Sequence, residues 1–150
     1  MKNLARLMVW FIPFFWVSKV DAQNEHPYYL HALEDLRAAR WLIHAVPGNN
    51  WKVNHEEEKT IKFIEDGIQE INLAAIRDNK DLDDHVGVDD NPNHMGRLNA
   101  AMDFLRKAKK DVRRDEDNKF AENLQDKSLH HIRRAIKQLK RAIRNSEKAL

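Results

Sequence analysis

The sequence of 150 residues contains no cysteine and only four glycines and four prolines. The lack of cysteine excludes disulfides, thiolate zinc sites, iron–sulfur clusters and covalently attached c-type haem. Because glycine and proline are scarce and 33% of the residues are charged, the composition favours helices over sandwiches, barrels or linker-rich chains. The length suits a single domain.

The first 22 residues have the order of a secretory signal. Two basic residues precede an apolar run at 7–17, and the small residue Ala22 stands where signal peptidase would cleave. The run is shorter than the roughly 20 residues that span a bilayer. We therefore expect residues 1–22 to be a signal peptide and residues 23–150 to form the mature domain in the periplasm or outside the cell. An uncleaved N-terminal anchor is the alternative.

Apolar residues of the remaining chain recur at helical steps of three and four in four segments. The four stripes are Tyr29, Leu33, Leu36, Ile43 and Val46; Ile61, Ile64, Ile68, Ile71 and Ala75; Leu98, Ala101, Leu105, Ala108 and Val112; and Leu129, Ile132, Ile136, Leu139 and Ile143. This spacing is typical of the seam of a helix bundle. Short breaks near 47–54, 78–93 and 113–127 favour antiparallel neighbours. The sequence predicts an all-α, antiparallel up-down-up-down four-helix bundle.

Helix starts are marked by residues that suit a first turn. Pro27 opens the first stripe, since proline is tolerated at the first helical position. Asn54 followed by Glu57 has the spacing of a capping box, and Ser128 is the candidate N-cap of the fourth helix. Arg40 lies close to the first apolar stripe, so we expect its aliphatic stem to be buried and its guanidinium to be paired with a carboxylate. An anion site between helices is the alternative role. The candidate partners are Glu65, Asp103 and Asp35.

Several segments of the mature chain resemble a known group of proteins. These segments are "HPYYLHALEDLRAARWLI", "DLDDHVGVDD", "GRLNAAMDFLRKAKKDVRRDEDN" and "HHIRRAI". They are similar to small exported bacterial four-helix-bundle proteins of uncharacterised function. The placing of histidine on alanine-rich helices also looks somewhat like histidine-rich periplasmic metal-binding bundles, which repeat histidine more densely. The resemblance implies a fold and a compartment, and no catalytic residues.

Histidines are the most concentrated chemical signal, with eight in the mature chain. In an alternating bundle, the first helix begins at the end where the third begins, so the histidines would gather in two groups. These are His26, His31, His85 and His94 at one end and His44, His55, His130 and His131 at the other. Imidazole and carboxylate together suit Cu²⁺ or Zn²⁺, which predicts low-affinity metal binding. The alternative is that these histidines cap helices or lie on solvated ends, since no pair has i,i+4 spacing.

The N-terminal part of the mature chain is acidic and the C-terminal part is basic. Residues 23–93 contain seven Lys and Arg against fifteen Asp and Glu, and residues 94–150 contain sixteen against eight. The simplest interpretation is that the two halves neutralise each other within one fold. Docking to an anionic lipid or polymer is the alternative for the basic run of the last helix. That run comprises Arg133, Arg134, Lys137, Lys140, Arg141, Arg144 and Lys148.

No catalytic motif accompanies these features. The sequence lacks a glycine-rich phosphate loop and a nucleophile elbow, and a nucleic-acid partner is not expected because aromatic residues do not interleave with the basic ones. We therefore expect an exported non-enzymatic binding protein, with low-affinity transition-metal binding through the histidines at the bundle ends. The alternative is a structural or stress-related module that contacts a protein or an envelope component without metal. We expect a monomer or dimer with no stable membrane insertion after signal cleavage.

Overall fold

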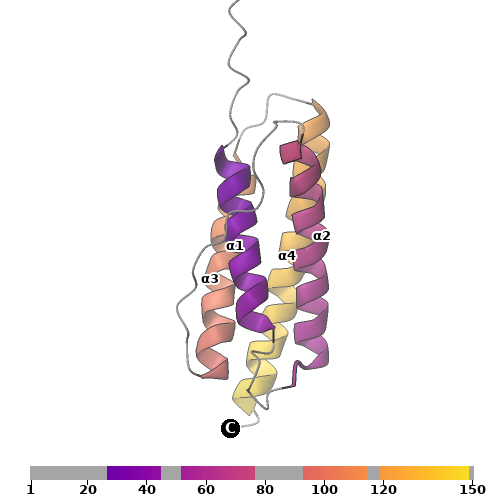
Figure 1. Cartoon of the computed structure of the whole chain (residues 1–150). Coiled ribbons are helices and arrows are strands. Elements are labelled where there is room, and N and C mark those ends of the chain that lie inside the picture. The colour runs from indigo at the N-terminus through magenta and orange to yellow at the C-terminus, as the bar shows by residue number, and fades with distance from the viewer. Residues whose placement is uncertain (1–26, 45–51, 77–92, 115–118, 149–150) are drawn as a thin grey trace, which may run out of the picture.

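The computed structural model describes residues 27–44, 52–76, 93–114 and 119–148. Its four elements are α-helices: α1 (Pro27–Ile43), α2 (His55–Ile76), α3 (His94–Val112) and α4 (Lys119–Lys148), packed side by side (Figure 1). The described ranges contain no strand. The all-α four-helix prediction is confirmed, whereas the predicted signal peptide lies outside the described residues.

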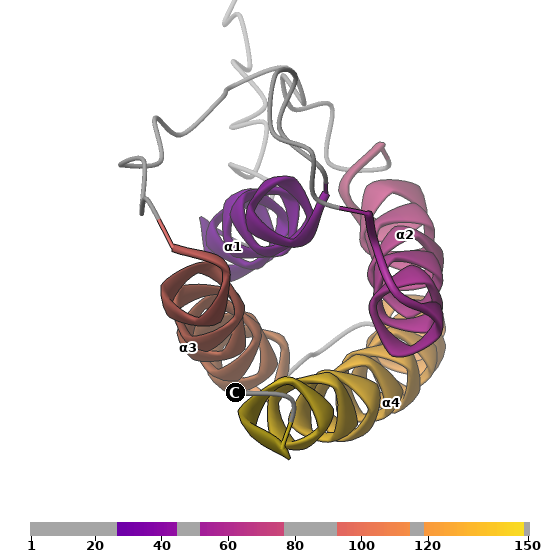
Figure 2. The same ribbon diagram turned by 90° about the horizontal axis from the view of Figure 1, so that it is seen from below.

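The helices form a ring in the order α1, α2, α4, α3 (Figure 2). The most extensive contacts join α2 to α4 and α1 to α3. The start of α1 lies against the end of α3, where the Arg114 guanidinium stacks 3.7 Å from the Tyr28 ring centroid. The starts of α2 and α3 also meet, because His94 Nε2 lies 2.9 Å from Glu57 Oε1. The helices α2 and α3 therefore run in the same direction across the diagonal of the bundle.

The predicted up-down-up-down order is wrong for the third helix. Instead of turning back beside α2, the chain passes from the end of α2 to the opposite end of the bundle before α3 begins (Figure 1). The result is two antiparallel hairpins joined by one long crossover, the connectivity of ferritin-like bundles. A 19-residue helix is about 29 Å long. The 16 residues from 77 to 92 can span roughly 50 Å, so their length permits either connection.

The four predicted stripes supply most of the core, whereas the side chains of Val46 and Ala75 lie outside the described ones. Fully or almost fully buried side chains come from every helix: Leu33 and Leu36, Ile64 and Ile71, Leu98 and Leu105, and Ile132 and Leu139. Each such side chain contributes roughly 1.5–3 kcal/mol when removed from water. Four isoleucines of the stripes are only partly buried and lie at the edge of this core: Ile61, Ile68, Ile136 and Ile143.

The predicted helix starts are confirmed for the first two helices. Pro27 is the first residue of α1. Asn54 and Glu57 form a reciprocal capping box, in which the Glu57 N–H donates to Asn54 Oδ1 at 3.0 Å and the Asn54 N–H donates to Glu57 Oε2 at 3.0 Å. These bonds satisfy two backbone donors at the start of α2.

The prediction that Ser128 caps the fourth helix is wrong. The helix α4 begins nine residues earlier, at Lys119, and Ser128 is buried within it, its hydroxyl 3.5 Å from the Gly67 carbonyl oxygen. The first turns of α4 are fixed by Gln125, whose side-chain amide donates to the carbonyls of Val112 and Arg114 at the end of α3. Ser128 thus lies at the contact between α2 and α4, where a small side chain permits close packing.

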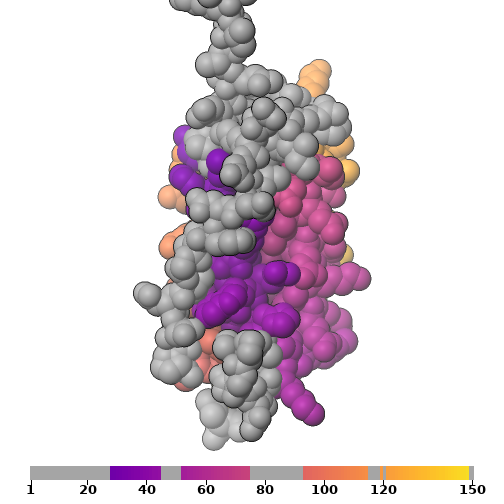
Figure 3. Space-filling model, in the orientation of Figure 1, coloured from indigo at the N-terminus to yellow at the C-terminus, as the bar shows by residue number. Residues whose placement is uncertain are grey.

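Large exposed apolar side chains of the described residues lie on the first hairpin. Tyr28 and Trp41 project from α1, and Leu73 projects from α2. Side chains of these two helices lie side by side on the face shown in Figure 3. None of the described helices has the length and apolar character required to cross a membrane.

Candidate functional site: a basic groove between α3 and α4

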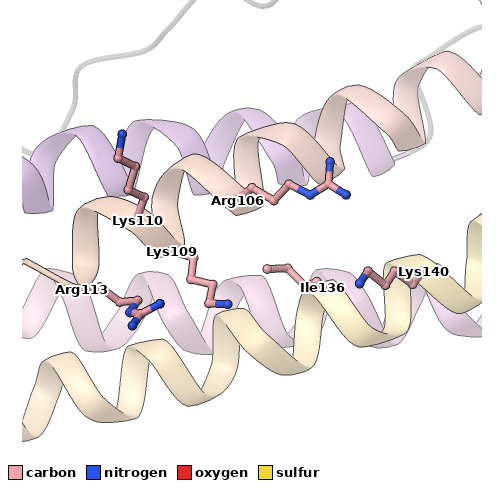
Figure 4. A pocket seen from close by; sticks show the side chains of 6 residues that line it. All are labelled: Arg106, Lys109, Lys110, Arg113, Ile136 and Lys140. Atoms are coloured by element: carbon pink, nitrogen blue, oxygen red, sulfur yellow. The ribbon is translucent and has the colours of Figure 1, made fainter.

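A groove of about 550 Å³ lies along the contact between α3 and α4. Five of its six lining residues are cationic: Arg106, Lys109, Lys110 and Arg113 from α3 and Lys140 from α4, with Ile136 of α4 as the sixth (Figure 4). Lys109 and Arg113 extend from α3 toward α4, and the Ile136 side chain lies between the two helices (Figure 4). We call this site the basic groove.

The basic groove continues toward the C-terminal end of α4. A second cavity of about 380 Å³ shares Arg106 and Lys140 with the first, so the two are contiguous. Its other lining residues are Asn99, Met102, Asp103, Ile143, Arg144 and Glu147. The charge of this second part is mixed, because two carboxylates stand among three cations. The groove is therefore wholly basic at one end and of mixed charge at the other.

The positive charge around the groove is mostly unpaired within the described residues. The described parts of α3 and α4 with their flanking residues carry sixteen Lys and Arg against five Asp and Glu. Two of these cations form ion pairs, Arg106 with Asp103 at 2.8 Å and Arg114 with Asp111 at 3.5 Å. In the same residue ranges, the seven cations of the basic run in α4 form none.

Mutual neutralisation of the acidic residues 23–93 and the basic residues 94–150 was the simplest expectation for this charge. In the described ranges, few direct ion pairs join the two. Where α4 packs on α2, His131 Nδ1 lies 3.7 Å from Asp66 Oδ2, a contact that is an ion pair only when the imidazole is protonated. Arg134 instead stacks on the ring of Phe63, 4.6 Å from its centroid. Cation–π stacking leaves the guanidinium its full charge. The cations of α4 therefore remain available to an external anion.

A second polar feature, the end cluster, closes the bundle where α2 and α3 begin. It consists of Asn54, Glu57, His94 and Arg97. Glu57 is completely buried, and its carboxylate accepts from Asn54 Nδ2 at 2.8 Å and lies 2.9 Å from His94 Nε2. Arg97 is 4% exposed. Burial lowers the pKa of His94, and the Glu57 carboxylate opposes that shift. The cluster ties α2 to α3 through the interior of the bundle.

The described histidines are not placed as the two predicted groups require. His94 lies at the end where α2 begins, near the side of the molecule predicted for His44 and His55, because α3 starts at the opposite end from α1. His131 lies midway along α4 beside Asp66, with His130 next to it. His31 stays at the start of α1, and His26 and His85 are outside the described residues.

No group of three His, Cys, Asp or Glu side chains in the described ranges is placed to hold a metal ion. The geometric argument for a metal site, which required His31 and His94 at the same end, is therefore lost. Low-affinity binding of Cu²⁺ or Zn²⁺ through individual histidines stays a prediction from the sequence.

Arg40 pairs with one of its three predicted partners. Its Nη1 donates to Glu65 Oε1 at 3.0 Å, which joins α1 to α2. The side chains are 49% and 46% exposed, so this ion pair lies at the surface. Two other charged residues are more buried than their sequence context indicates, Arg97 and Asp35. Burial raises the pKa of Asp35 to about 6, since it faces the α1–α3 contact.

Comparisons with known protein families, with curated proteins and with solved structures find no match for this chain.

Proposed function

We propose that this chain is an exported, non-enzymatic binding protein that recognises an anionic partner through the basic groove. The observation that supports this proposal is the set of cations along α3 and α4 that lack carboxylate partners in the described residues. Folded proteins normally intersperse charges of both signs, and an unmatched cationic surface attracts anions and steers their approach. The partner we propose belongs to the cell envelope or its surroundings, in keeping with the predicted leader.

The geometry of the groove favours binding over simple solvation. Its cations stand on two packed helices, so their backbone positions are fixed before a partner arrives and little order has to be imposed on binding. A single exposed ion pair contributes only about 0–1 kcal/mol. Five such contacts to one polyanion supply at most about 5 kcal/mol, which corresponds to a Kd on the order of 0.1–1 mM. This affinity would fall as salt screens the charges over a Debye length of about 8–10 Å.

The position of the large exposed apolar side chains favours an interaction at the protein surface over insertion of the groove helices into lipid. Within the described residues, the large exposed apolar side chains belong to α1 and α2 and none to α3 or α4. An interfacial membrane helix requires an apolar face next to its basic one. Electrostatic recognition by the cations of the basic groove therefore fits these residues better than insertion into lipid does.

The proposal is tested by binding of polyanions to the purified protein. Fluorescently labelled poly-L-glutamate, polyphosphate and anionic vesicles would be titrated at low salt and again at about 0.3 M salt, where screening is strong. We expect at least one probe to bind, to be released by salt, and to lose affinity in the double variant Lys109→Glu/Lys140→Glu. The matched control is Lys59→Glu/Lys62→Glu, which changes the charge equally on α2. Equal loss in both variants, or no binding of any probe, would refute the proposal.

A further inference from the structure

The residues that line the basic groove are spaced so that one more helix could pack between α3 and α4. Resting on the function proposed above, we infer that the anionic partner is a protein that supplies an acidic amphipathic helix. This helix packs lengthwise between α3 and α4. Three properties of the groove favour this occupant: the spacing of its apolar floor, the spacing of its cationic rims and the mixed charge at one end.

The floor of the groove has heptad spacing. Ile136 and Ile143 line its two parts and are seven residues apart on α4. Seven residues of helix correspond to two turns and about 10.5 Å. Both isoleucines are only partly buried and pack against the core. An incoming helix with apolar residues at heptad spacing would cover both at once, as in a coiled-coil seam.

The rims of the groove repeat once per helical turn. On α3, Arg106, Lys109 and Arg113 follow one another at steps of three and four, and on α4 Lys140 and Arg144 do the same. One turn corresponds to about 5.4 Å. Glutamates on both flanks of an amphipathic helix recur at this same interval, so each turn would meet a cation from either side. A charged rim around an apolar seam is also the arrangement that selects partners in coiled coils.

The end with mixed charge favours a protein over a uniform polyanion. Asp103 and Glu147 line the groove beside Ile143 and would repel phosphates at that end. A polyphosphate chain or a lipid surface has the same charge along its whole length and gains nothing there. A peptide can place a basic residue opposite these carboxylates, which also fixes its direction in the groove.

The experiment uses designed peptides and the purified protein. The first peptide is an amphipathic 21-mer with leucine at heptad positions, glutamate on both flanks and lysine at one end. The second has the same composition in scrambled order. We expect the amphipathic peptide to bind at least ten-fold more tightly by fluorescence anisotropy and to gain helicity by circular dichroism on binding. Polyphosphate and anionic vesicles serve as the competing probes.

One substitution with a matched control tests the contribution of the apolar floor apart from that of the cationic rims. Ile136→Ser should weaken the binding of the amphipathic peptide by about ten-fold, because part of the apolar floor of the groove is lost. The binding of poly-L-glutamate should stay unchanged. The control is Ile61→Ser on α2, which changes an equally placed, partly buried isoleucine away from the groove. Circular dichroism of each free variant establishes that it is folded.

The outcomes distinguish this inference from the function on which it rests. Equal affinity for the two peptides, or tighter binding of polyphosphate or vesicles than of the amphipathic peptide, overturns the acidic helix and leaves an anion-binding groove. Binding of no probe, or binding that Lys109→Glu/Lys140→Glu weakens no more than the control variant on α2 does, overturns both. Tighter binding of the amphipathic peptide that depends on Ile136 supports the inference.

Discussion

Replacing the buried Glu57 by alanine should lower the free energy of unfolding more than replacing any other carboxylate of α2 by alanine. The Glu57 carboxylate is completely buried and lies at 3.0, 2.8 and 2.9 Å from the Asn54 N–H, Asn54 Nδ2 and His94 Nε2, respectively. A hydrogen bond to a charged group contributes about 1.5–3 kcal/mol, and a helix cap about 1 kcal/mol. Because these terms are not additive, we expect the free energy of unfolding to fall by about 3–5 kcal/mol, the range for breaking a buried pair.

The measurement is urea unfolding followed by far-UV circular dichroism at neutral pH. Glu58→Ala is the matched control, since this residue lies in the same first turn, is exposed and contributes to the helix dipole only about 0.3–1 kcal/mol. A Glu57→Ala variant within about 1 kcal/mol of the control would show that the end cluster does not hold α2 and α3 together.

The same cluster predicts a dependence on pH. Because burial lowers the pKa of His94, the folded protein binds this proton less tightly than the unfolded chain. The contribution of the neutral imidazole is therefore complete above the ordinary pKa of about 6.5 and declines as the pH falls below it. His94→Gln should cost more stability at about pH 7.5 than at about pH 5. A loss that is the same at both values, or greater in acid, would contradict this explanation.

Three further predictions concern other parts of the bundle. Asp35→Asn should stabilise the protein at neutral pH by about 1–1.5 kcal/mol, roughly half of what a full shift of the carboxyl pKa to about 6 implies. This gain should vanish toward pH 4 as Asp35 is protonated, and urea unfolding at both pH values measures it. Gly67→Ala should raise stability by about 0.5–1 kcal/mol, because alanine favours helix and its Cβ would meet only ordinary contacts of 3.7–3.8 Å; a lower melting temperature would contradict this fit. Zn²⁺ or Cu²⁺ should raise the melting temperature only slightly at millimolar concentration, and a large rise at micromolar concentration would restore a specific metal site.

Local features of the fold were predictable because they depend on neighbouring residues. The stripes of apolar residues determine which face of each helix is buried, and the Asn54–Glu57 box requires only a spacing of three. Glu65 was one of three candidate partners for Arg40, and the packing of α1 against α2 brings these two side chains together. Each of these predictions uses a spacing that the chain itself carries.

The path of the chain between the hairpins was not predictable in the same way. Residues 77–92 are long enough for either a return or a crossover, and no residue pattern within them decides between the two. The error placed His94 at the wrong end, and with it the predicted metal ligands. The burial of Arg97 and the partial burial of His94 depend on the position of α3 beside the start of α2, which is distant in sequence. The basic run in α4 was recognised, but its alignment with Arg106, Lys109 and Arg113 required the position of α3.

The crossover connectivity makes the two hairpins depend on each other to bury their apolar faces. Each helix makes its broadest contact with a helix from the other hairpin, α1 with α3 and α2 with α4. Neither hairpin can therefore shield its own apolar face when alone, so the two are obligate complements. A single proteolytic cut between residues 77 and 92 should leave two fragments that migrate as one particle. Two intact chains could also exchange hairpins, giving an intertwined dimer with the same four-helix units.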